Sequence, residues 1–146
     1  MTGPRRSAVW PGLAVALAAA GLAIAGYLTI VRLSGGLPAC GPLEGCDQVA
    51  SSPYSEVFGI PVAALGLGFS SIVLASLLAW WRTGSRRAAV VAYGMGLVGV
   101  LVVAYLTYLE LFVIHAICAW CVAYGLTVIL GWAITAVGLR VEASRI

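Results

Sequence analysis

Charged residues are scarce in this sequence. Only 9% of the 146 residues are Asp, Glu, Lys or Arg, there is no Lys and no Asn, and 62% are hydrophobic. A soluble domain carries about 25% charged residues, so this chain cannot cover a water-facing surface and a soluble enzyme is excluded. A net charge of +3 from eight Arg is too sparse to follow the phosphates of a nucleic acid. Intrinsic disorder requires a more polar chain, and an integral membrane protein is the class that remains.

Long uncharged runs divide the chain. A transmembrane helix needs about 20 apolar residues, and no segment alternates polar and apolar residues as a barrel strand does. The sequence therefore predicts an all-α integral membrane protein, with a bundle of four transmembrane helices in one domain over residues 1–146. The four runs lie between Arg6 and Arg32, Glu56 and Arg82, Arg87 and Glu110, and His115 and Arg140. We expect helices at about 10–33, 57–81, 88–112 and 116–139, with a long outer catalytic loop at 34–56.

The arginines are distributed unequally between the two sides of the membrane. Basic residues gather in the cytoplasmic segments of membrane proteins, and seven of the eight arginines fall at the two ends of the chain or between helices 2 and 3. Four spans place these three segments on one side. We therefore expect a multi-pass protein of the cell (cytoplasmic) membrane with both termini in the cytoplasm. The first run is longer than the about 7–15 apolar residues of a signal peptide, so we interpret it as a retained helix.

The four cysteines all fall on the outer side in this topology. Cys40 and Cys46 lie in the outer loop, and Cys118 and Cys121 lie at the outer start of helix 4. That compartment permits disulfides, and four cysteines can pair in three ways. The pairings 40–46 with 118–121, 40–118 with 46–121, and 40–121 with 46–118 all remain open at this point.

The segment Cys118-Ala119-Trp120-Cys121 is a C-x-x-C motif. The free N–H groups and the dipole of a helix start stabilise a thiolate, and the second sulfur lies one turn away. Such a pair suits reversible oxidation, whereas a structural disulfide would join distant segments. A zinc site with four thiolates and purely structural disulfides are the alternatives. We favour two local pairs that exchange disulfides with each other, and we expect no metal.

Electrons from such a relay need an acceptor. The sequence shows no haem, flavin or Fe–S motif, and a lipid-soluble quinone is the remaining two-electron acceptor. Aromatic residues of helices 3 and 4 could form the walls of a quinone pocket, although aromatic residues also serve as interfacial belts and core. A transporter tends to bury ionisable groups near the membrane midplane, whereas Glu110 and His115 lie at an outer end.

Two stretches resemble the vitamin K epoxide reductase family. The first is Cys40-x5-Cys46 with the residues that follow it to Gly66, including Phe58-Gly59-Ile60-Pro61, and the second is Ile117-Cys118-Ala119-Trp120-Cys121. The resemblance covers nearly the whole chain and implies a four-helix bundle around a quinone, capped by the outer loop. Bacterial members have a DsbB-like role: they oxidise a thioredoxin-like or DsbA-like protein on the outer side and pass two electrons to a quinone. The quinone would be of the menaquinone, ubiquinone or phylloquinone type.

The resemblance also implies roles for individual residues. Cys40 and Cys46 would be the shuttle pair that meets the partner protein, and Cys118 and Cys121 the active-site pair, with Cys121 nearest the quinone. Ser52 would hold a quinone oxygen. Since the given chain stops at Ile146, we expect the partner to be a separate protein. The other residues that we assign to quinone binding are Phe58, Tyr108, Phe112 and Tyr124.

Two other functions remain as alternatives. A vitamin K quinone or epoxide reductase would use the same cysteines. A metal-binding or transport membrane protein would belong to another class.

Overall fold

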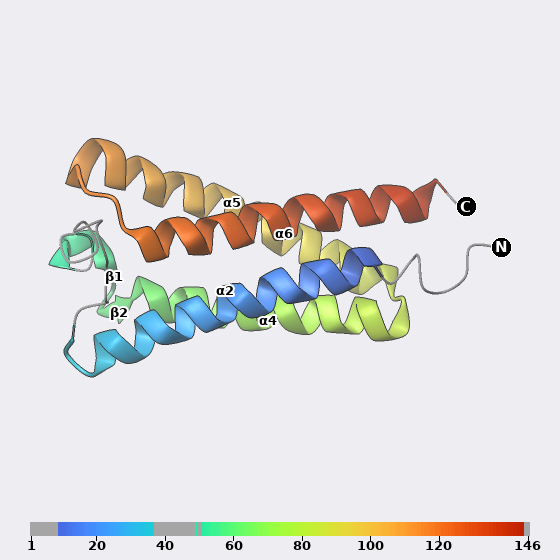
Figure 1. Ribbon diagram of the computed structural model, residues 1–146, viewed down its shortest axis with the longest axis horizontal. Coiled ribbons are helices and arrows are strands. Elements are labelled where there is room, and N and C mark those ends of the chain that lie inside the picture. Colours follow the sequence, from blue (N-terminus) through green and yellow to red (C-terminus); the bar gives the residue numbers. More distant parts are fainter. Residues whose placement is uncertain (1–8, 37–48, 50, 145–146) are drawn as a thin grey trace.

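Four long helices make up most of the protein. The computed structural model describes residues 9–36, 49 and 51–144, and Figure 1 shows the helices lying side by side. They are α2 (Val9–Leu33), α4 (Val62–Thr83), α5 (Arg86–Tyr108) and α6 (Ala119–Ala143). A short π-helix, η2 (Leu109–Ile114), continues α5. All four helices are long and apolar enough to cross a membrane, which confirms the predicted all-α four-helix membrane bundle.

The helices run up and down in sequence order. α2 packs against α4 and α6, and α5 packs against the same two helices, so every neighbouring pair is antiparallel. The third and fourth helices, α5 and α6, are thus antiparallel neighbours. We call the end of the bundle where α2 stops and α4 and α6 begin the cysteine end. The opposite end, where α2 begins, α6 stops and α4 turns into α5, is the arginine end (Figure 1).

The turn at the arginine end follows ordinary capping rules. Gly84 terminates α4 with φ of 65° and donates its N–H to the carbonyl of Trp80 at 2.8 Å. Glycine suits this left-handed position because it has no Cβ to clash. Ser85 then caps α5, and its hydroxyl oxygen accepts the N–H of Ala88 at 3.4 Å. The short turn keeps α4 and α5 in contact.

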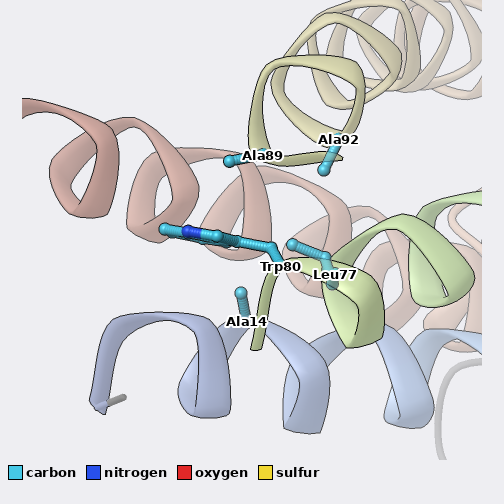
Figure 2. Close-up of a cluster of buried hydrophobic side chains, with 5 residues drawn as sticks. All are labelled: Ala14, Leu77, Trp80, Ala89 and Ala92. Carbon is cyan, nitrogen blue, oxygen red and sulfur yellow. The ribbon is translucent and has the colours of Figure 1, made fainter. Parts of the chain in front are cut away.

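The arginine end has a closely packed core. Figure 2 shows the Trp80 ring between Ala14 of α2 and Ala89 of α5, beside Leu77. A Cβ placed on Gly138 would lie 2.6 Å from Cη2 of Trp80, so α6 can approach the ring only because this residue has no side chain. The indole Nε1 donates to Oε1 of Glu142 at 3.0 Å.

A small hairpin precedes α4 at the cysteine end. The 3-10 turn η1 (Pro53–Ser55) leads into β1 (Glu56–Val57), which pairs antiparallel with β2 (Ile60–Pro61). Phe58 and Gly59 form the turn with φ of 53° and 80°. We call residues 53–61 the cap segment. Most of the predicted outer loop at 34–56 lies outside the described residues, which omit 37–48 and 50.

Two helix starts differ from the sequence prediction by three residues or more, whereas α2 and α5 begin within two residues of it. Helix 2 was expected from residue 57 but begins at Val62, because the hairpin turn occupies the preceding residues and Pro61 supplies the N-cap. Helix 4 was expected from residue 116 but begins at Ala119. His115 adopts a left-handed conformation with φ of 58°, which ends the preceding helix, and Cys118 is extended. Apolar composition locates a span but does not show where the backbone bends.

Candidate active site

The C-x-x-C motif forms the first turn of α6. Cys118 is the N-cap, and its sulfur accepts the backbone N–H of Cys121 at 3.2 Å. Its carbonyl accepts the N–H of Val122 at 3.0 Å, the first hydrogen bond of the helix. Both cysteines are free thiols in the structure. A cysteine at the N-cap directs its sulfur to the unpaired N–H groups of the helix start.

This arrangement favours the thiolate of Cys118. The hydrogen bond from the Cys121 thiol is the largest effect and lowers the pKa of Cys118 below the value of an ordinary cysteine. Burial and the nearby charge of Glu110 act in the opposite direction. Cys118 is only 3% exposed, so it is a protected nucleophile.

Glu110 is the residue that our sequence analysis did not include in the site. It is 6% exposed, and its Oε2 accepts the backbone N–H of Cys118 at 3.4 Å. The Cys121 thiol lies close to the same carboxyl group. The signal available in the sequence was its position, eight residues before Cys118 at the end of an otherwise uncharged run.

The π-helix accounts for the inward position of Glu110. Within η2, Leu109 and Glu110 are buried, whereas the three residues that follow are exposed. The carbonyl of Glu110 accepts the N–H groups of both His115 and Ala116. π-helical turns occur often at functional sites, and this one presents a carboxyl group to the C-x-x-C motif without interrupting the span.

A large cavity opens beside the cysteines. Its volume is about 460 Å³, and Cys118, Cys121 and Glu110 form part of its wall. Binding sites for small molecules typically measure about 300–1,000 Å³ and combine apolar walls with a few polar groups. The walls here are mainly apolar residues of α2, α4 and α5, such as Leu28, Leu65, Phe69, Val103 and Leu106. The cavity therefore fits a flat apolar ring with polar substituents.

Two of the predicted quinone-binding residues line this cavity. Ser52 lies at its wall and donates its hydroxyl to the carbonyl of Val49 at 2.8 Å. Tyr124 lies at the wall as well, and its hydroxyl donates to the carbonyl of Gly66 at 3.2 Å and lies 2.9 Å from Oγ of Ser70. Tyr124 thus joins α6 to α4 while its ring faces the cavity.

The other three predicted quinone-binding residues do not line the cavity. Phe58 is fully exposed at the tip of the hairpin. Tyr108 and Phe112 are more than half exposed, and their ring centroids lie 5.2 Å apart on the outside of the bundle. The shuttle cysteines predicted at 40 and 46 lie outside the described residues, so their roles, and the zinc alternative that needs them, stay predictions.

An ion pair joins the cap segment to α2 at the cavity. Nη2 of Arg32 lies 2.8 Å from Oε1 of Glu56 and donates to Oγ of Ser55 at 3.4 Å. Arg32 and Ser55 also line the cavity. The pair therefore fastens the hairpin over one side of the cavity, close to the end of α2.

Comparison with known proteins identifies the family of this chain. Residues 13–136 match the sequence model of the Vitamin K epoxide reductase family. The chain belongs to the vitamin K epoxide reductase family. No protein among the curated ones matches the chain. The matched region includes all four helices in whole or in part, the cap segment and the C-x-x-C motif.

Membership establishes the general activity. The protein is a multi-pass membrane oxidoreductase of the vitamin K epoxide reductase and DsbB-like kind. Members of this family use quinones in general. The cavity beside Cys121 has the size and the apolar walls that such a molecule needs.

Proposed function

We propose that the protein is a quinone-dependent thiol–disulfide oxidoreductase that reoxidises a thioredoxin-like or DsbA-like protein on the outer side of the cell membrane. Cys40 and Cys46 form the pair that takes electrons from this partner, and Cys118 and Cys121 form the pair that delivers them to the quinone. The quinone is of the menaquinone, ubiquinone or phylloquinone type. A bound quinone supplies an acceptor for two electrons and two protons.

One observation carries this proposal. The C-x-x-C motif lies in the wall of a cavity of about 460 Å³, and its first cysteine caps α6. Disulfide exchange needs a thiolate, and electron transfer needs the acceptor next to the sulfurs. The same few residues supply both, since the pKa of the Cys118 thiol is lowered and Cys121 lies one turn further along α6.

The residues of this chain then have separate tasks. Cys118 exchanges with a shuttle cysteine, because it lies at the helix start and nearer the outer loop. Cys121 lies about 4.5 Å further along the helix axis and meets the quinone. Ser52 and Tyr124 shape the wall at which the ring is held, and the Arg32–Glu56 pair holds the cap segment over it. The excess of arginine at the other end supports cytoplasmic termini and cysteines on the outer face.

Quinone reduction by the purified protein in lipid nanodiscs tests the proposal. Two donors are compared: a reduced thioredoxin-like protein, and dithiothreitol, which is small enough to reduce the inner pair directly. The wild type should reduce a menaquinone analogue with either donor. Cys118→Ala should abolish both reactions. Cys40→Ser and Cys46→Ser should lose the protein donor and keep the reaction with dithiothreitol.

The same experiment can contradict the proposal in two ways. If Cys118→Ala reduces quinone as fast as wild type, the C-x-x-C motif is not the electron donor. If the two loop variants behave like wild type with the protein donor, the shuttle assignment is wrong while the inner site stands.

A further inference from the structure

Glu110 is the one carboxyl group among the described residues that line the cavity. It is nearly as buried as Cys118, and a carboxyl group in an apolar span is costly unless it has partners or a function. The other titratable or charged groups in the same lining are Arg32, Tyr54, Tyr105, Tyr124 and the two cysteines. Glu56 does not line the cavity, but it forms an ion pair with Arg32, which does. Among the residues that the structure describes, Glu110 is therefore the acid that lies closest to the redox chemistry.

The contacts of Glu110 place it against both cysteines. Its Oε2 accepts the N–H of Cys118, and the carboxyl group lies close to the Cys121 thiol in the same cavity wall. The carboxyl group and both cysteines line the same cavity. The carboxyl group is an acceptor close to the thiol, and a ring in the cavity would be within reach of the same group.

Building on the proposed function, we propose that Glu110 is the catalytic proton-transfer residue that takes the thiol proton of Cys121 and delivers it into the cavity as the disulfide forms. The bond that forms is Sγ–Sγ between Cys118 and Cys121, and the bond that breaks is S–H of Cys121. Two electrons leave the sulfurs for the quinone. Glu110 accepts one proton from Cys121 and passes it on with them, so the carboxyl group has the same ionisation state before and after the step.

The second proton has a different origin. Cys118 reacts as a thiolate, so its proton was released to the outer medium when the thiolate formed, and one proton from that medium completes the quinol. Arg32, with its partner Glu56, is the charged group at the cap side of the cavity. The tyrosine hydroxyl of Tyr124 is engaged with Gly66 and Ser70 on α4, which leaves the carboxyl group as the mobile acid next to Cys121.

A structural role alone makes a different prediction. If Glu110 served only to accept the N–H of Cys118, a neutral amide oxygen would do the same, and Glu110→Gln would resemble wild type. A proton carrier needs an ionisable group, so Glu110→Asp should retain part of the function and Glu110→Gln should not. Glu142→Gln is the matched control, because its amide oxygen can still accept from Trp80 far from the cysteines.

The first measurement needs no quinone. Infrared difference spectra between the reduced and the oxidised protein, stripped of quinone, should contain a carboxyl signal, because oxidation of the two cysteines changes the surroundings of Glu110. The signal should vanish in Glu110→Gln and persist in Glu142→Gln. Identical difference spectra in wild type and Glu110→Gln would overturn the proposal, whether or not the protein reduces quinone.

The second measurement concerns rate. With dithiothreitol as donor, Glu110→Gln should reduce quinone at least about 10²-fold more slowly than wild type, the usual size of a general acid–base effect, and Glu110→Asp should lie between them. Wild type should lose activity as the pH falls through the range in which Glu110 becomes protonated, and Glu110→Gln should lack that limb. A Glu110→Gln rate equal to wild type would contradict the inference alone, whereas an inactive wild type would contradict the proposed function.

Discussion

The two ends of the bundle differ in how they use small residues. At the arginine end, Ala14, Ala89 and Gly138 let helices close around Trp80, and the core there is completely buried. At the cysteine end, Ala25, Ala63 and Gly66 line a cavity of about 460 Å³ instead. Similar side chains therefore give close packing at one end and an open volume at the other. The arginine end therefore contributes packing stability, and the cysteine end contains the candidate active site.

The sharpest stability test lies at Trp80. Trp80→Ala should lower the free energy of unfolding by about 3–5 kcal/mol, because a fully buried indole leaves a large void. Its neighbour Trp81, which is 47% exposed, is the matched control, and Trp81→Ala should cost no more than about 1 kcal/mol. Unfolding by SDS in mixed micelles measures both. Quinone reduction per folded molecule should be unchanged, and equal losses in the two variants would contradict the division between the ends.

Adding the same side chain at each end tests the comparison directly. Ala89→Leu should destabilise the arginine end by about 1–3 kcal/mol, the usual cost of overpacking, and leave the KM for quinone unchanged. Ala63→Leu should occupy part of the cavity, raise that KM several-fold and change stability little. SDS unfolding and steady-state kinetics measure the pair. A quinone KM that rises in Ala89→Leu and not in Ala63→Leu would place the quinone elsewhere.

The pH dependence of Cys118 tests the electrostatics of the cysteine end. The hydrogen bond from the Cys121 thiol lowers the pKa of Cys118, so the reactive thiolate should persist to lower pH than in an ordinary cysteine. Cys121→Ala removes this donor and should move the midpoint of Cys118 alkylation to higher pH. Cys121→Ser keeps a hydroxyl donor and should shift it less. A small membrane-permeant alkylating reagent followed by mass spectrometry gives the midpoints, and a downward shift in Cys121→Ala would have the wrong sign.

The smallest effect is expected at the ion pair of the cap segment. Arg32 and Glu56 are both partly exposed, and such pairs contribute about 0–1 kcal/mol. A double-mutant cycle of Arg32→Gln and Glu56→Gln, followed by SDS unfolding, should give a coupling free energy in that range. A coupling of several kcal/mol would mean that the cap segment is a structural part of the bundle and not a cover of the cavity.

Composition was sufficient to predict the membrane class and the four helices. The gaps between charged residues set the number of spans, because each run is long enough to cross the hydrocarbon layer. The spacing of charged residues could not predict the backbone conformation at the cysteine end. The left-handed His115 and the late start of α6 depend on local hydrogen bonds to the carbonyl of Glu110, which an apolar pattern does not record.

The sequence likewise predicted only some of the residues at the candidate site. Cys118 and Cys121 carry a motif with its own chemistry, and Tyr124 lies one turn beyond on the same helix. Phe112 and Tyr108 were chosen as aromatic residues near the cysteines, but which way they face depends on the π-helix, which turns Glu110 inward and leaves Phe112 outside. A widened turn changes the direction of every later side chain, and sequence periodicity assumes a regular helix.

The position of the quinone can be measured directly. The purified protein is illuminated in nanodiscs with a photoreactive azidoquinone, and the labelled peptides are identified by mass spectrometry. We predict labelling of the cavity wall on α4 and α5, within residues 61–69 and 98–107, which an excess of natural menaquinone abolishes. Labelling confined to the arginine end, around Ala14 and Trp80, or labelling that natural quinone does not diminish, would contradict the account.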